Sequence, residues 1–270
     1  RWGDGSLLEH GGALRAAAAH YRIPLGDWLD VSTGINPQGW PVPPLPATVW
    51  QRLPETGDGL EDAAAAYYGT PHLLPVAGSQ AVIQALPLLR EPGQVGVLHP
   101  GYAEHAHAWR RAGYQVEALA TEALNEAVDR LDVLVLIHPN NPTGQRFDQA
   151  TLLDWRGRLA VRGGWLVVDE AFIDATPEDS LADQIGLPGL IVLRSLGKFF
   201  GLAGARVGFA LAESAVLERL QKMLGPWTVS GPARWVAMQA LQDRAWQEQM
   251  RVELLRSGKR LADLLKRQGL

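Results

Sequence analysis

Two uninterrupted apolar runs constrain the fold of this 270-residue chain more than any other feature. Residues 133–137 read Val-Leu-Val-Leu-Ile, and residues 165–168 read Trp-Leu-Val-Val directly before Asp169. Runs without polar alternation are typical of strands buried on both faces, which occur in parallel sheets covered by helices. Ligands of such sheets collect at the carboxyl ends of the strands. We therefore expect an α/β domain with its functional residues at one edge of the sheet.

Helical and strand patterns alternate along most of the chain, which predicts three layers: a mixed, mostly parallel sheet with helices on both faces. The predicted strands span residues 95–98, 114–119, 132–138, 165–169, 190–194 and 206–211. The predicted helices span residues 61–68, 79–90, 103–112, 149–162, 213–224 and 233–268. Glycine costs about 1 kcal/mol relative to alanine inside a helix, so a kink or break is expected at Gly258.

Four prolines within residues 40–46 mark a linker between two parts of the chain. We predict an N-terminal arm over residues 1–43 and a large ligand-binding α/β domain over residues 44–225. Residues 226–270 then form the helical start of a small C-terminal domain.

The composition fits a soluble cytoplasmic enzyme. The net charge of −4 is small, so no nucleic-acid partner is expected, and the absence of cysteine excludes disulfides and thiolate metal sites. No apolar run is long enough to cross a membrane, and no signal-peptide pattern opens the sequence. We interpret four scattered histidines as surface or packing residues, since their spacing predicts no metal site. They are His99, His105, His107 and His138.

Lys198 is the first candidate for chemistry. It lies in the segment Ser-Leu-Gly-Lys-Phe-Phe-Gly that begins at Ser195, and Arg206 follows eight residues later. An amine among glycines, with a hydroxyl and a guanidinium nearby, suits an aldehyde cofactor that also carries a phosphate. The amine would form a Schiff base, and Ser195 and Arg206 would hold the phosphate. The alternative is a surface lysine on a glycine-rich loop.

Asp169 and Asn141 are candidates for contacts with the ring of the same cofactor. A carboxylate at the end of a buried strand can keep a pyridine nitrogen protonated, which makes the ring an electron sink. The alternative for Asp169 is a helix cap or turn residue. Asn141 lies in His-Pro-Asn-Asn-Pro-Thr-Gly after the other buried strand, where its amide could donate to a ring oxygen. A plain loop is the alternative there.

The order of these three segments resembles that of the fold type I pyridoxal-phosphate enzymes. Within that family the chain is most similar to the branch that holds histidinol-phosphate aminotransferase and threonine-phosphate decarboxylase. The resemblance extends from His10 onward and implies a mixed seven-stranded sheet, pyridoxal 5'-phosphate as cofactor and a homodimer. It also implies that Lys198 carries the cofactor and moves protons, that Asp169 pairs with the ring nitrogen, and that Asn141 contacts the ring oxygen.

The remaining cofactor contacts follow from the same resemblance. Tyr102, after Pro-Gly, would stack on the ring, although a core position is the alternative for a lone tyrosine. Residues 77–86 resemble a glycine turn that starts a helix under the phosphate, where backbone N–H groups and the helix dipole favour an anion. An ordinary core helix is compatible with that reading. The implied phosphate site comprises Ser79, Gln80, Ser195 and Arg206.

The sequence departs from the family in three places. Phe172 stands where many relatives have a tyrosine that contacts the ring oxygen. Leu53 replaces a tyrosine that often reaches the cofactor phosphate of the partner subunit. Relatives usually continue beyond Leu270 through a small domain that carries an arginine for the substrate carboxylate. We therefore interpret the 270 residues as a fragment with an incomplete small domain.

The arm separates the candidate functions. His10 would contact a substrate phosphate, Gly34 and Ile35 would offer backbone groups, and Asn141 would also face the substrate. These features resemble the cobalamin-pathway decarboxylase, so the leading hypothesis is decarboxylation of L-threonine O-3-phosphate to (R)-1-amino-2-propanol O-phosphate. Lys198 and Asp169 would be its catalytic residues.

Two alternatives stay open. The first is a class I/II aminotransferase acting on histidinol phosphate or a related amine, which removes the α-hydrogen instead of the carboxylate. The second is a non-catalytic sensor that keeps the cofactor site. Such modules are fused to DNA-binding segments, and the sequence shows no basic or helix-turn-helix segment.

Overall fold

A seven-stranded sheet forms the centre of the computed structural model, which describes residue 8 and residues 10–269. The strand order is β1-β7-β6-β5-β4-β2-β3, and β7 pairs antiparallel with both of its neighbours while the other pairs are parallel. This confirms the mixed, mostly parallel sheet. The strands are β1 (Leu73–Val76), β2 (Gln94–Leu98), β3 (Gln115–Leu119), β4 (Val133–Ile137), β5 (Trp165–Asp169), β6 (Leu190–Ser195) and β7 (Gly208–Leu211).

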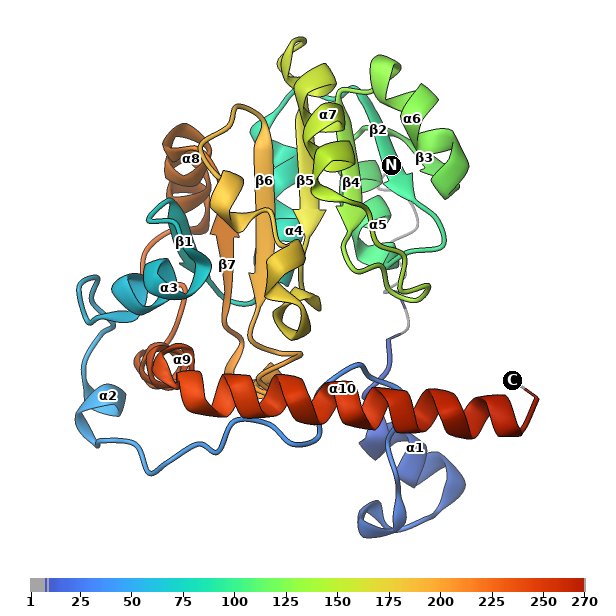
Figure 1. Cartoon of the computed structure of the whole chain (residues 1–270). Coiled ribbons are helices and arrows are strands. Elements are labelled where there is room, and N and C mark those ends of the chain that lie inside the picture. The colour runs from blue at the N-terminus through green and yellow to red at the C-terminus, as the bar shows by residue number, and fades with distance from the viewer. Residues whose placement is uncertain (1–7, 9, 270) are drawn as a thin grey trace.

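Helices cover both faces of the sheet (Figure 1). They are α1 (Leu14–Tyr21), α2 (Thr48–Gln51), α3 (Leu60–Tyr68), α4 (Ser79–Ala85), α5 (Ala103–Arg111), α6 (Leu124–Ala127), α7 (Gln149–Ala160), α8 (Ser214–Leu224), α9 (Gly231–Gln242) and α10 (Arg244–Arg267). Leu134 and Leu136 of β4 pack in a cluster with α3, α6, α7 and α9. Val133 and Val135 pack in a second cluster with α4, α5 and α8. The alternation explains why both faces of the strand are apolar.

The predicted break at Gly258 in the helical segment 233–268 is wrong. The structure divides this segment at Asp243, whose side chain accepts a hydrogen bond from the backbone N–H of Trp246 and caps α10. Gly258 lies inside the continuous helix. Its cost of about 1 kcal/mol is small compared with the hydrogen-bond ladder of 24 residues, so the helix continues through it.

The structure differs from the prediction at other places as well. β1 was not predicted, because it has four residues and contains Pro75, which favours an edge position. The helix at residues 79–90 changes after Ala85 into a 3₁₀ helix, Leu86–Leu89, with Pro87 at its start. β7 begins at Gly208 and not at Arg206, since Arg206 has a left-handed backbone with φ of 55°.

The carboxyl ends of β4, β5 and β6 meet at one edge of the sheet. Figure 1 shows α10 crossing beyond this edge, with the arm that carries α1 on the same side. The backbone N–H of Asn36, at the end of the arm, donates to the carbonyl of Lys198 at 3.0 Å. None of the helices in the described part of the chain combines the length and apolar character needed to cross a membrane.

Candidate active site

One cavity at this edge brings together all the residues that the sequence assigned to the cofactor. Parallel strands place their carboxyl ends side by side, so β5 contributes Asp169, β6 contributes Ser195, and the loop after β4 contributes Asn141. Phe172 and Gly197 are among the other lining residues. The eight assigned residues that line the cavity are Ser79, Gln80, Tyr102, Asn141, Asp169, Ser195, Lys198 and Arg206.

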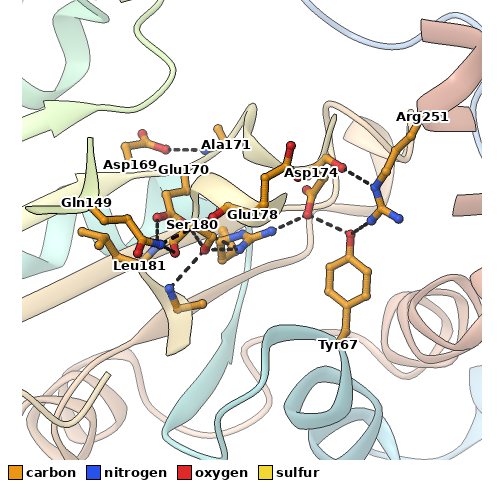
Figure 2. Close-up of polar contacts among 12 residues, drawn as sticks. Tyr67, Gln149, Asp169, Glu170, Ala171, Asp174, Glu178, Ser180, Leu181 and Arg251 are labelled. Carbon is orange, nitrogen blue, oxygen red and sulfur yellow. Dashed lines mark hydrogen bonds and ion pairs between the residues drawn. The ribbon is translucent and has the colours of Figure 1, made fainter. Parts of the chain in front are cut away.

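Asp169 is 4% exposed and has a partner for each carboxylate oxygen. Its Oδ1 accepts from the backbone N–H of Ala171 at 3.1 Å, so the turn interpretation describes part of its role (Figure 2). Its Oδ2 lies 2.8 Å from Nε2 of His105 in α5. The interpretation of His105 as an ordinary packing histidine missed this contact. It joins positions 64 residues apart, and no local pattern signals it.

Lys198 is half-buried, and this burial lowers the pKa of its amine. The negative charge of Asp169 opposes the decrease, and the positive charge of Arg206 adds to it. Its Nζ lies 5.4 Å from the centre of the Phe172 ring, which supplies part of the apolar surroundings. A lowered pKa increases the fraction of neutral amine at a given pH, and the neutral amine is the nucleophile.

A cradle for an anion lies between α4 and the loop that holds Arg206. Gly78 has a φ of 76° and precedes the helix, and a Cβ built there would come within 2.6 Å of a terminal nitrogen of Arg206. The guanidinium therefore occupies the space that a side chain at position 78 would fill. Ser79 and Ser195, which both carry a hydroxyl, line the same cavity. A guanidinium, two hydroxyls and backbone N–H groups at a helix start fit a phosphate group.

Tyr102 and Asn141 complete the cavity wall. The Tyr102 hydroxyl donates to Oε1 of Gln80 at 3.4 Å, and burial raises the pKa of this phenol. The neighbouring Asn140 is buried and holds the loop, because its amide donates to the carbonyl of Pro100 at 2.8 Å. Of the two adjacent amides, only Asn141 lines the cavity. Tyr102 fits one face of a flat ring, and Asn141 fits its edge.

The arm contacts residues at and next to the cavity wall at two points, but the predicted substrate residues His10, Gly34 and Ile35 do not line the cavity itself. His10 Nε2 lies 2.6 Å from Oε1 of Glu104, and its ring centre is 5.8 Å from that of Tyr102. A Cβ at Gly34 would lie 2.8 Å from the ring of Phe172, so glycine permits this close approach. Ile35 is half-buried beside it. Outside the cavity, Leu53 is 62% exposed, while Glu104 is a buried residue that the sequence reasoning missed.

The mostly parallel sheet, the half-buried lysine beside a strand-end carboxylate and the anion cradle define a fold type I pyridoxal-phosphate enzyme. Residues 52–270 match the family described as aminotransferase class I and II, and the chain belongs to this family. It is 59% identical over 263 residues to a threonine-phosphate decarboxylase of Pseudomonas aeruginosa, covering 97% of this chain and 80% of that protein.

More distant relatives include both threonine-phosphate decarboxylases, at 44% and 31% identity, and aminotransferases. A histidinol-phosphate aminotransferase of Yersinia enterocolitica is 33% identical, with 77% of this chain and 59% of that protein covered. Among solved structures, the fold is similar to that of aspartate aminotransferase from Thermus thermophilus with maleate. The TM-score is 0.78 at 21% identity, over 98% of this chain and 79% of that one.

Proposed function

We propose that this chain decarboxylates L-threonine O-3-phosphate to (R)-1-amino-2-propanol O-phosphate, with pyridoxal 5'-phosphate as cofactor, in cobalamin biosynthesis. The observation that carries the proposal is the 59% identity to a threonine-phosphate decarboxylase across 97% of the chain. Histidinol-phosphate aminotransferases match at lower identity and over a smaller part of their length, for example 33% over 59%. The composition of the cavity supports the same class of chemistry.

The cavity residues hold the cofactor in this proposal. Ser79, Gln80, Ser195 and Arg206 bind its phosphate, Tyr102 covers one face of the ring, and Asn141 donates to the ring oxygen. When bound, the cofactor supplies an electron sink for the electron pair left by departing carbon dioxide. The Asp169 carboxylate, oriented by His105, stabilises the positive charge of the protonated ring nitrogen.

Lys198 has two tasks. Its neutral amine, which burial favours, would hold the cofactor through the aldehyde carbon, with the aldehyde oxygen leaving as water. With substrate bound, the freed Lys198 amine would hold a proton and would deliver it to the carbon that has lost its carboxylate. The balance is loss of one carbon dioxide and gain of one proton at the same carbon.

The arm positions the substrate in this proposal. His10 binds the substrate phosphate, Gly34 and Ile35 present backbone groups, and Asn141 also faces the substrate. These residues decide which bond stands perpendicular to the ring, and the electron sink weakens that bond selectively. We further propose a homodimer. The exposed apolar side chains of Leu29, Val31 and Trp50 on the arm and the following segment support it.

Incubation with threonine phosphate in the absence of any keto acid tests the proposed function. We expect carbon dioxide to be released while the number of amino groups stays constant. Lys198→Ala serves as the control without the covalent bond, and borohydride reduction of the native protein should label Lys198. A requirement for 2-oxoglutarate would instead establish the aminotransferase, and a change in cofactor absorbance without product would establish a sensor.

A further inference from the structure

Glu104 forms hydrogen bonds with three side chains from two segments of the chain, the arm and α4, although it does not line the cavity. It is the second residue of α5 and is 9% exposed. Its carboxylate lies 2.6 Å from His10 Nε2 and accepts from the amides of Gln80 at 2.8 Å and Gln84 at 3.0 Å. Burial opposes ionisation of this carboxyl, but the hydrogen bonds from His10 and Gln80 outweigh it and lower the pKa. None of the steps proposed above uses this carboxylate.

The position of Glu104 in the first turn of α5 connects it to the rest of the site. Tyr102, directly before the helix, lines the cavity, and His105, directly after Glu104, holds Asp169. Glu104 itself joins Gln80 of the cofactor-phosphate turn to His10 of the arm. Because one helical turn fixes these three side chains relative to one another, the arm and the cofactor site share a single rigid support.

Residues 10–35 of the arm form a loop that contacts the rest of the protein near its two ends. No side chain from residue 10 to residue 35 is buried. The two ends of this loop are joined to each other, because the backbone N–H of Gly12 donates to the hydroxyl of Ser32 at 2.8 Å. The first end contacts the rest of the protein through His10, which bonds to Glu104. The second end approaches it at Gly34, which packs against Phe172.

We propose that Glu104 is a positioning residue that docks the N-terminal arm and holds the His10 imidazole beside Tyr102, which lines the cavity. Through Gln80 the same carboxylate ties this docking to the cofactor-phosphate turn. The assignment of His10 to the substrate phosphate rests on the proposed function, whereas the docking of the arm does not. Glu104 acts on the substrate through His10, so loss of either side chain has the same consequence.

Limited trypsin digestion of the cofactor-free protein tests the docking without any assay of activity. Arg15 and Arg22 are exposed on the arm, and Arg256 is exposed on α10 as an internal reference. Cleavage of an opened segment follows the population of the open form. We expect Glu104→Gln to accelerate cleavage at Arg15 and Arg22 about fivefold to tenfold and to leave cleavage at Arg256 unchanged. Glutamine keeps an acceptor for His10, so the factor corresponds to the loss of the charge assistance in one hydrogen bond.

Steady-state kinetics test the consequence for the substrate. We expect Glu104→Gln to raise KM for threonine phosphate about tenfold and to change kcat less than about threefold, since the chemical groups are intact. His10→Gln should give the same increase in KM. The double variant should also raise KM about tenfold and not about 100-fold, because the two residues act as one unit. Glu126→Gln, which alters an exposed glutamate of α6, is the charge-matched control.

The outcomes separate this inference from the proposed function. Unchanged cleavage at Arg15 and Arg22, or multiplicative effects in the double variant, would overturn the positioning role. A lower melting temperature and weaker cofactor binding with wild-type cleavage rates would likewise assign Glu104 a structural role only. If the wild-type protein releases no carbon dioxide from threonine phosphate, the proposed function fails, while the digestion still decides whether Glu104 docks the arm.

Discussion

At the scale of single residues, the site depends on how each charged group is held. Asp169 uses one oxygen for the turn at Ala171 and the other for His105. A carboxylate that is 4% exposed is costly to leave without partners, so His105 both stabilises the charge and fixes its direction. The sequence pattern predicted the acid at the end of the strand. It could not predict the imidazole, because only the packing of α5 against the sheet brings the two together.

Replacing His105 tests this arrangement. We expect His105→Asn to reduce kcat/KM for threonine phosphate about 10-fold to 100-fold, since a hydrogen bond to a charged group contributes about 1.5–3 kcal/mol. Steady-state kinetics give the ratio. His72→Asn, which alters an exposed histidine before β1, is the matched control and should leave the ratio unchanged. Equal activities of the two variants would show that the ring contact of Asp169 does not depend on His105.

The pKa of Lys198 leads to a second residue-scale prediction. Its ordinary value is 10.5, and burial lowers it, so the neutral amine is populated at lower pH than in an exposed lysine. The rate of covalent capture of pyridoxal phosphate by the cofactor-free protein should therefore rise with pH to a midpoint below 10.5. Absorbance changes at a series of pH values measure this midpoint.

Two variants should shift that midpoint in opposite directions. Phe172→Ala admits water beside the amine and should move the midpoint upward, toward the ordinary value. Asp169→Asn removes the charge that raises the pKa and should move it further down. A midpoint that is the same in all three proteins would contradict the proposed control of the amine.

At the scale of elements, the start of α10 is determined by a capping side chain and not by the helix propensity of single residues. The helix continues through Gly258 because nothing in its surroundings requires a break, and it begins at Asp243 because that side chain caps its first turn. Sequence patterns indicated a helical segment over most of residues 233–268. They did not locate the break, because a glycine inside a helix lowers the stability of the helix without ending it.

Gly258→Ala should stabilise the protein. A Cβ at this position would have no heavy atom within 4 Å, so the substitution adds helix propensity without a clash. We expect a gain of about 1 kcal/mol and a rise in melting temperature of about 2–4 °C, measured by thermal unfolding. Gly208→Ala is the opposite case, because its Cβ would lie 2.7 Å from backbone atoms of Arg194 and Ser79. A lower melting temperature for Gly258→Ala would contradict the argument.

At the scale of the whole molecule, the sequence predicted the layers and the lining of the cavity better than the residues that hold the lining in place. The apolar runs of β4 and β5 predicted a buried sheet, and the motifs at the strand ends predicted residues that now share one cavity. The supports were missed because they are contacts between distant segments. His105 meets Asp169 across 64 residues, and His10 meets Glu104 across 94.

A second set of long-range contacts joins the elements behind the site. Glu170 follows Asp169 but contacts a separate cluster, where it accepts from Ser180 and from the backbone N–H of Leu181 (Figure 2). Arg194 of β6 pairs with both Glu170 and Asp174, and all three side chains are almost completely buried. Burial raises the pKa of Glu170, and the positive charge of Arg194 opposes this.

Asp174 extends this cluster to two helices. Its carboxylate accepts from the hydroxyl of Tyr67 in α3 at 2.9 Å, and its carbonyl accepts from Arg251 of α10 at 2.9 Å (Figure 2). Arg194→Met should therefore leave two buried carboxylates without their cation and lower the free energy of unfolding by about 3–5 kcal/mol, measured with denaturant. Arg130→Ala breaks an exposed pair with Glu117 and should leave stability unchanged. Equal stabilities of the two variants would mean that this cluster does not join the sheet to α3 and α10.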